Sequence, residues 1–278
     1  MVVKIVTDST SDISPEIANA LDITVVPVYV GFGDEVYRDG VDISNDEFYQ
    51  KLATLLVHPA TSQPTPEDFA KVYSDCSKEA DGIISIHISD KVSGAYNAAL
   101  QSKKMTKEEC QIEVVDSYVT SVGLALIVMA AAKLASAGGG LLDVFEERRR
   151  VISRVYITGL VNTMKYLLLG GRLDKVTAVM ASILDIKPLL AFRDGDIVRA
   201  GLVHIYQQWI DRLRKFVESY SDIQDLAIAY STEPEQANQL KTRLGSTFRD
   251  NDIYITQLGA GLGVHVDPGG LIVALRRE

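Results

Sequence analysis

Cysteine is scarce in this 278-residue chain, which contains only Cys76 and Cys110. Two isolated cysteines form neither a disulfide framework nor a metal-ligand spacing, and they suit a reducing compartment. The histidines share no ligand-type spacing with one another or with the cysteines. They are His58, His87, His204 and His265. We therefore expect a cytoplasmic protein without a metal centre or other cofactor.

Long apolar runs are also missing. The longest, residues 122–132, is too short to cross a bilayer, so we expect no stable membrane insertion. The first residues lead directly into a strand-like segment, so we expect no signal peptide.

Nucleotide-binding loops are absent as well, because no GxGxxG follows a strand and neither GxxxxGKS nor GxxxxGKT occurs. The net charge of −9 is unevenly spread. Up to Ser153 there are 13 Lys and Arg against 23 Asp and Glu, and from Arg154 on there are 15 against 14. An acidic first half argues against a nucleic-acid partner, and the asymmetry favours two domains with different roles.

Short apolar segments alternate with helix-like segments through the first half. The expected strands are 2–6, 23–31, 83–88 and 112–116. Ser14-Pro15 and the capping box Ser44–Glu47 mark two helix starts. This alternation is typical of a mainly parallel sheet with helices on both faces.

The second half has a different pattern, in which segments 186–192 and 197–202 flank an Asp-Gly turn and predict a hairpin. We predict two α/β domains: residues 1–153 with a mainly parallel sheet, and residues 154–278 with a mixed sheet and helices. Pro27 indicates an edge or irregular position within strand 23–31. Residues 34–40 are predicted as turns, and residues 58–65, with two prolines, as neither helix nor regular strand.

The stretch 82–105 places Ser93 and Gly94 where a buried strand passes into a helix. Free N–H groups at the helix start, the Ser93 hydroxyl and the close approach that Gly94 allows favour an anion here. The alternative is that Ser93 is only a helix cap. Other hydroxyl-rich segments at the same expected sheet edge are 8–11, Thr61-Ser62 and 116–117. Such an edge suits one carboxylate or phosphate.

Two groups of the second half could join this edge. Arg172 follows a glycine pair, and His265 lies in a glycine-rich loop where it could donate to an anion or act as acid or base. The alternatives are an exposed helix-terminal arginine and a structural histidine. A serine hydrolase or acyltransferase using Ser93 with His265 is a further alternative, although KVSGA lacks the GxSxG elbow.

Seven segments, spread over essentially the full length and in the same order, resemble the DegV family of bacterial fatty-acid-binding proteins. They are VTDSTSDIS, ATSQPTPEDF, ISDKVSGAYNAA, VVDSYVTSVGLAL, YLLLGGRLDK, LDIKPLLAFRDGDI and GLGVHVDPGG.

The resemblance implies a binding protein, not an enzyme, that buries a long-chain fatty acid in the N-terminal domain with the carboxylate between the domains. It places Thr61 and Ser93 on the carboxylate, beside Ser62 and the Gly94 backbone, with Arg172 and His265 from the second domain. It also implies a separate fatty acid kinase that makes the acyl phosphate for phospholipid synthesis. The apolar helix 119–137 could line the acyl tunnel or be plain core.

The chain departs from the family pattern at two places. Val203-His204-Ile205-Tyr206 stands where the family commonly has a basic stretch expected to meet the kinase, so a carrier or regulator without a kinase is a second reading. Asp267 stands where a glycine is usual, and its charge is expected to raise the pKa of His265.

Overall fold

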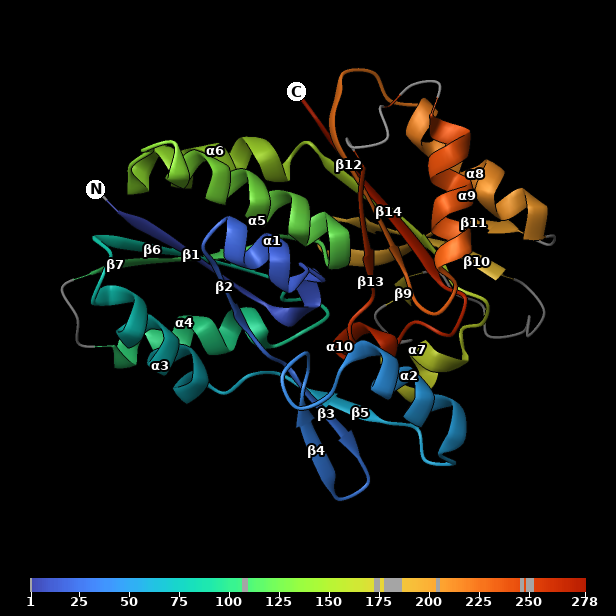
Figure 1. Ribbon diagram of the computed structural model, residues 1–278, viewed down its shortest axis with the longest axis horizontal. Helices are drawn as coiled ribbons and strands as arrows, with labels where there is room; N and C mark the ends of the chain where they lie inside the picture. Colours follow the sequence, from blue (N-terminus) through green and yellow to red (C-terminus); the bar gives the residue numbers. More distant parts are fainter. Residues whose placement is uncertain are drawn as a thin grey trace.

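The computed structural model describes residues 2–106, 110–172, 176–177, 187–203, 206–245, 248 and 253–278. Within these residues the strands form three sheets (Figure 1). The first sheet comes from the first half of the chain, and its neighbouring strands are all parallel, as predicted. In spatial order they are β2 (Ile23–Val26), β1 (Val3–Asp8), β6 (Gly82–His87) and β7 (Gln111–Asp116).

Helices cover both faces of this parallel sheet (Figure 1). Ile5 of β1 packs toward α5 (Ser121–Ser136) and α6 (Leu141–Ile152). Its neighbour Val6 packs toward α3 (Pro66–Ser77) and α4 (Ala95–Met105). The alternation follows from the two-residue period of a strand. The helix starts predicted from Ser14 and Ser44 are confirmed, at α1 (Pro15–Ala20) and α2 (Asn45–Thr54).

The second sheet comes from the second half and is mixed, as predicted. In spatial order its strands are β13 (Ile253–Gln257), β12 (Ile223–Tyr230), β14 (Leu271–Arg277), β8 (Val155–Leu160), β10 (Lys187–Arg193), β11 (Asp196–Val203) and β9 (Val176–Thr177). Helices α8 (Tyr206–Glu218) and α9 (Pro234–Leu244) pack on one face around Trp209. The predicted hairpin is present as β10 and β11, with left-handed Asp194 and Gly195 at its turn.

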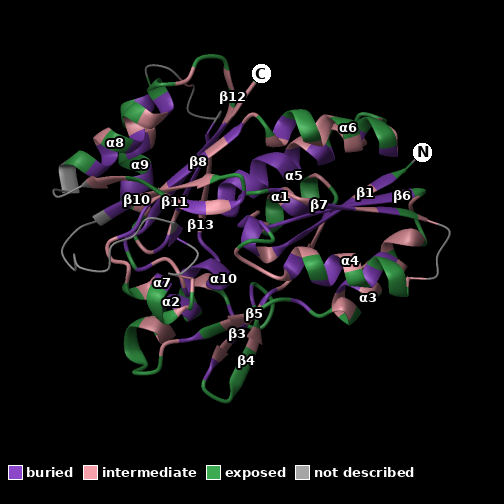
Figure 2. Cartoon of the chain, turned by 180° about the vertical axis from the view of Figure 1, so that it is seen from behind, coloured by how far each residue is buried: buried purple, intermediate pink, exposed green. Residues whose placement is uncertain are grey.

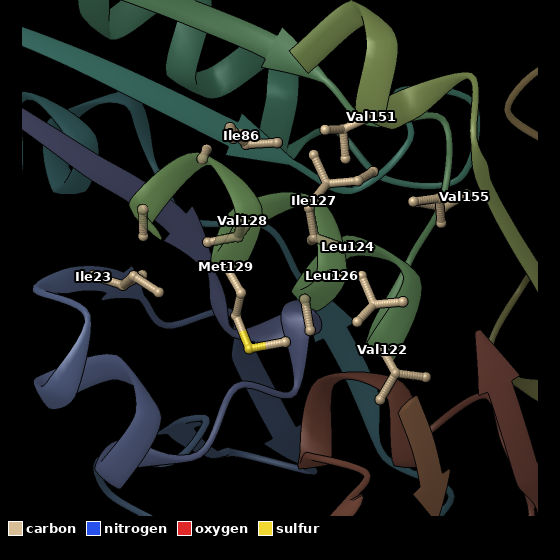
Figure 3. Close-up of a cluster of buried hydrophobic side chains, with 14 of the residues drawn as sticks. Ile23, Ile86, Val122, Leu124, Leu126, Ile127, Val128, Met129, Val151 and Val155 are labelled. Atoms are coloured by element: carbon tan, nitrogen blue, oxygen red, sulfur yellow. The ribbon is translucent and has the colours of Figure 1, made fainter. Parts of the chain in front are cut away.

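Helix α5 is the element that the two large sheets share. It packs against β1 of the first sheet and against β8, β12 and β14 of the second. Side chains on all sides of it, among them Leu124, Ile127 and Val128, are buried (Figures 2 and 3). One apolar core therefore runs from one sheet to the other, and the predicted boundary at residues 153/154 falls between α6 and β8.

The third sheet corrects three expectations. Segment 23–31 is not one strand, because Pro27 ends β2 and the chain leaves for another sheet as β3 (Tyr29–Phe32). Residues 34–40 contain β4 (Glu35–Arg38), which is paired with β3. Segment 58–65 contains β5 (Ala60–Ser62), because its two prolines flank the strand instead of interrupting it. The short elements η1 (Ser9–Ser11), α7 (Lys165–Leu169) and α10 (Ala260–Gly263) complete the described chain.

Candidate functional site

A cavity of about 950 Å³, part of its open mouth included, lies where the two halves of the chain meet. Nine of its lining residues precede residue 153 and fifteen follow it. Most are apolar, such as Val92, Ile157, Leu190, Phe192 and Ile272. Of the predicted helix 119–137, Thr120, the N-cap of α5, lines the cavity, whereas residues 121–136 do not and belong to the core.

Five of the six predicted site residues line this cavity. They are Thr61, Ser62, Ser93, Arg172 and His265. Gly94 does not line it: this residue is the N-cap of α4, and the Gln63 side chain packs so closely over it that a Cβ would lie 1.9 Å from Gln63 Oε1. The chain therefore brings hydroxyls from β5 and from the β6–α4 turn together with a cation and an imidazole from the second half.

Thr61 and His265 are in direct contact across the two halves. Thr61 Oγ1 lies 3.0 Å from His265 Nε2, whereas Nδ1 of the same ring is buried without a hydrogen-bond partner in the described chain. A proton on Nδ1 would leave a buried donor unsatisfied, so we place it on Nε2, where it is donated to Thr61. The hydroxyl hydrogen of Thr61 then remains available to a ligand.

The imidazole of His265 is neutral. Burial, followed by the positive charges of Arg172 and His58, lowers its pKa to about 3. The expectation that Asp267 raises this pKa is wrong, because the Asp267 carboxylate accepts a hydrogen bond from the backbone N–H of Asn162 at 2.9 Å and burial dominates at the ring.

Arg172 is held by the end of α7. Gly171 takes the left-handed conformation (φ +69°), Arg172 N–H donates to Leu167 O at 2.8 Å and Gly171 N–H to Leu168 O at 3.1 Å, which together form a Schellman cap. The guanidinium then donates to Gly170 O at 2.9 Å and, across the halves, to Val92 O at 3.4 Å. Within the described residues two of its five N–H donors are used in these bonds, so the others can meet an anion.

Ser93 lies beside that contact, one residue after Val92. Its Oγ accepts a hydrogen bond from Ala95 N–H at 3.3 Å and donates to no group among the described residues, so the hydroxyl hydrogen can meet another acceptor. The alternative that Ser93 is the cap of this helix is wrong, because Gly94 is the N-cap of α4 and Ser93 lies one residue before it. No hydrogen bond joins Ser93 to His265 within the described chain, and no carboxylate meets His265 Nδ1 there, so the pair is not built as a nucleophile with its base.

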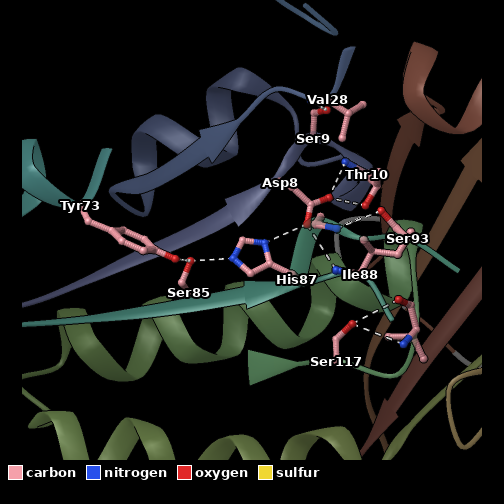
Figure 4. A network of polar contacts seen from close by, with 12 residues as sticks. Asp8, Ser9, Thr10, Val28, Tyr73, Ser85, His87, Ile88, Ser93 and Ser117 are labelled. Carbon is pink, nitrogen blue, oxygen red and sulfur yellow. Dashed lines mark hydrogen bonds and ion pairs between the residues drawn. The ribbon is translucent and has the colours of Figure 1, made fainter. Parts of the chain in front are cut away.

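A buried polar network behind the cavity was not anticipated (Figure 4). The Asp8 carboxylate at the end of β1 accepts from His87 Nδ1 at 2.9 Å, from Ile88 N–H at 3.3 Å and from the cavity residue Thr10. His87 Nε2 lies 2.6 Å from Ser85 Oγ, and this oxygen accepts a hydrogen bond from the Tyr73 hydroxyl at 2.8 Å. The network fixes the carboxyl ends of β1 and β6, from which the Ser93 turn departs. The sequence signals for this network are Ser85 and His87, two polar residues inside an otherwise apolar strand.

The fold and cavity define an α/β protein of two large sheets that enclose an apolar space with hydroxyl, guanidinium and imidazole groups in its wall. The sequence profile of the family described as "Uncharacterised protein, DegV family" matches residues 2–277. The chain belongs to the DegV family. A DegV domain-containing protein of Deinococcus radiodurans is 32% identical over 99% of this chain and 98% of that protein.

Solved structures agree with this assignment. A DegV family protein from Thermus thermophilus, described by its fatty acid binding, superimposes with a TM-score of 0.90 at 30% identity and covers 100% of both chains. DegV from Bacillus subtilis, described as a fatty acid binding protein, gives 0.92 at 25% identity, again over 100% of both chains. Within the described residues of the present chain, no helix is long and apolar enough to cross a membrane.

Proposed function

We propose that this protein binds a long-chain fatty acid, with the alkyl chain in the cavity and the carboxylate at Thr61, Ser62, Ser93, Arg172 and His265. The observation that carries the proposal is one apolar cavity whose polar donors are contributed by both halves. The two relatives from Thermus thermophilus and Bacillus subtilis that are described by fatty acid binding share the fold over their whole length.

Hydrophobic burial supplies most of the affinity in this proposal. Each buried methylene contributes about 0.8 kcal/mol, so a 16-carbon tail gains on the order of 10 kcal/mol before the costs of association. The polar groups then need only to orient the head group. Thr61 and Ser93 each offer an O–H donor, Arg172 offers charged N–H groups, and neutral His265 fixes the Thr61 hydroxyl.

We propose further that the tail lies between residues 1–153 and 154–278, enclosed by both domains. The excess of lining residues from the second half supports this placement over burial in the first domain alone. The Gly94 backbone then supports the turn that carries Ser93 without touching the carboxylate.

We also propose that the protein is a carrier in the cytoplasm that presents the carboxylate to a separate fatty acid kinase. The family resemblance supports this role, and so does the lack of a nucleotide-binding loop in the sequence. His204 and Tyr206 stand where the family commonly has basic residues that are expected to contact the kinase. His204 and the side chain of Tyr206 lie outside the described residues.

Titration of delipidated protein with hexadecanoic acid tests the binding proposal. Thr61→Ala and Ser93→Ala are each expected to weaken binding by about 1–3 kcal/mol, because each removes a donor to a buried charge. Ser77→Ala is the matched control, since Ser77 lies on α3, outside the cavity lining. A wild-type protein that binds no long-chain acid would refute the proposal, and unchanged affinity in both variants would remove these hydroxyls from the site.

The kinase role has its own test. Loaded protein is mixed with ATP, Mg²⁺ and a purified bacterial fatty acid kinase, and acyl phosphate is trapped with hydroxylamine. Product that depends on the carrier is the expected result. No product, in a reaction where a known carrier gives one, would leave a lipid carrier or regulator that works without a kinase.

A further inference from the structure

The short helix α10 separates the ligand cavity from a second, more polar cleft. Gly261 and Leu262 line the ligand cavity, whereas Gly259 lines the cleft on the other side. The helix begins five residues before His265, and His265 N–H donates to Leu262 O at 2.8 Å. The position of α10 therefore sets the position of the imidazole.

Two carboxylates of the first half hold the start of this helix. Gly259 N–H donates to Asp12 Oδ1 at 2.8 Å, Ala260 N–H to Asp39 Oδ1 at 2.9 Å and Gly261 N–H to Asp39 Oδ2 at 3.1 Å. These are the backbone donors that a helix start leaves unsatisfied. Asp12 and Asp39 are 6% and 4% exposed, so buried carboxylates meet buried N–H groups.

The fit leaves α10 little room to shift. A Cβ on Gly261 would lie 2.5 Å from Val28 Cγ2, and a Cβ on Gly263 would lie 2.4 Å from Phe48 Cε1. At the far end of the helix, His58 Nε2 lies 3.0 Å from Val264 O. The helix is thus packed tightly along its length and anchored at its start by hydrogen bonds to the carboxyl groups of Asp12 and Asp39.

Replacing the carboxyl group by the amide of asparagine, which has the same shape, has different consequences at residues 39 and 12. Asp39 uses both oxygens to accept from N–H groups, so an amide nitrogen in place of one oxygen breaks a bond. Asp12 uses only Oδ1 in this way, and its Oδ2 lies 2.6 Å from Ser121 Oγ, a hydroxyl that can accept from an amide. Asparagine therefore preserves the bonds at residue 12 and breaks one at residue 39.

We propose that Asp12 and Asp39 are positioning residues for the head-group site: by holding the first turn of α10 they keep His265 on Thr61 and so maintain the preference for a carboxylate. The proposal rests on the proposed fatty-acid function. Neither carboxylate lies in the direct head-group set, and their action passes through the helix.

Two ligands with the same tail and different head groups distinguish a loss of head-group positioning from general damage to the cavity. Hexadecanoic acid and hexadecan-1-ol share the tail and differ in the head group, so their affinity ratio reports on the head-group site. Asp39→Asn is expected to weaken the acid about tenfold and the alcohol less than about twofold, since one hydrogen bond in the anchor is lost. Asp12→Ala is expected to behave in the same way, and Asp12→Asn to restore the wild-type ratio.

A double-mutant cycle with His265→Ala tests the route of the effect. Asp39→Asn should cost little acid affinity in a protein that already lacks the imidazole. The ¹⁵N resonance of His265 Nε2 should shift in Asp39→Asn and Asp12→Ala and match wild type in Asp12→Asn. Equal losses for acid and alcohol, or an undiminished loss in the His265→Ala background, would overturn the proposal.

Failure of the positioning proposal can be distinguished from failure of the proposed function. A wild-type protein that does not favour the acid over the alcohol refutes the carboxylate site itself. In that case the His265 ¹⁵N resonance alone decides whether the two aspartates position the ring, and an unchanged resonance in Asp39→Asn and Asp12→Ala would show that they do not.

Discussion

The glycine pair before Arg172 allows one site contact to be removed by adding a single methyl group. A Cβ on Gly170 would lie 2.1 Å from His265 Nδ1, too close for the ring to stay in place. The backbone of Gly170 (φ −77°, ψ 1°) accepts alanine without strain, so Gly170→Ala acts through the imidazole. The ring must leave Thr61, whose hydroxyl then loses its fixed orientation.

The expected loss follows from that hydrogen bond. A hydrogen bond to a charged group is worth about 1.5–3 kcal/mol, so losing the orientation of the Thr61 donor should weaken hexadecanoic acid binding by up to roughly 100-fold. The matched control is Gly171→Ala, whose Cβ would meet nothing within 4 Å but whose φ of +69° strains an alanine. It should lower the free energy of unfolding by about 1 kcal/mol and, because alanine can still adopt the left-handed conformation of the cap that holds Arg172, reduce the acid affinity less than Gly170→Ala does.

Calorimetric titration at pH 7 measures the acid affinity of both variants, and thermal unfolding measures their stability. Wild-type affinity in Gly170→Ala would show that the imidazole does not orient the head-group donors. An equal loss in Gly171→Ala would show that the whole turn, rather than the methyl group facing His265, is responsible.

Three further predictions concern other parts of the chain. Burial raises the pKa of Asp12 to about 8, so the free energy of unfolding should fall as pH rises from about 4 to about 8, by at most about 1.4 kcal/mol per pH unit. Urea unfolding of Asp12→Asn should lack this pH dependence, and an unchanged pH dependence would assign it to another group. His87→Ala leaves the Asp8 carboxylate buried without its ring partner and should cost about 3–5 kcal/mol in the same assay; a loss below about 1 kcal/mol would contradict the network. Ala191→Phe places a ring in the cavity, so it should weaken a 16-carbon acid more than a 12-carbon acid, and equal effects would place the tail elsewhere.

The layout of the large sheets could be predicted because each half carries a regular pattern. Apolar strands separated by capped helices specify a parallel sheet, and the Asp-Gly turn specifies the hairpin. The third sheet could not be predicted, because β3, β4 and β5 have three or four residues each. Their pairing is decided by contacts between segments that are distant in the sequence, and the prolines around β5 concealed it.

The site was predictable in composition but only partly in geometry. Hydroxyls after strands and an arginine after two glycines mark candidates, and the cavity lining includes Thr61, Ser93, Arg172 and His265. The two positions require glycine for different reasons. Residue 171 has a left-handed backbone, and residue 170 must leave room for the His265 imidazole, which comes from a loop about 95 positions later. Only the folded chain reveals the second reason. The hydrogen bond that the Asp267 carboxylate accepts from Asn162 N–H likewise depends on tertiary contacts.

Helix α5 also limits how the cavity can exchange its contents with the surroundings. Eleven of its sixteen residues are buried between the two large sheets. Swinging the sheets apart would expose side chains such as Leu124 and Ile127, at about 1.5–3 kcal/mol each. Access to the cavity is therefore expected to need only small displacements of the segments next to its lining residues Val92 and Ile197, where Lys91 pairs with Asp196 at 2.7 Å and Ser89 donates to Gly195 O at 2.8 Å. Because that ion pair is partly exposed, the rate of exchange, unlike the affinity, should respond to ionic strength.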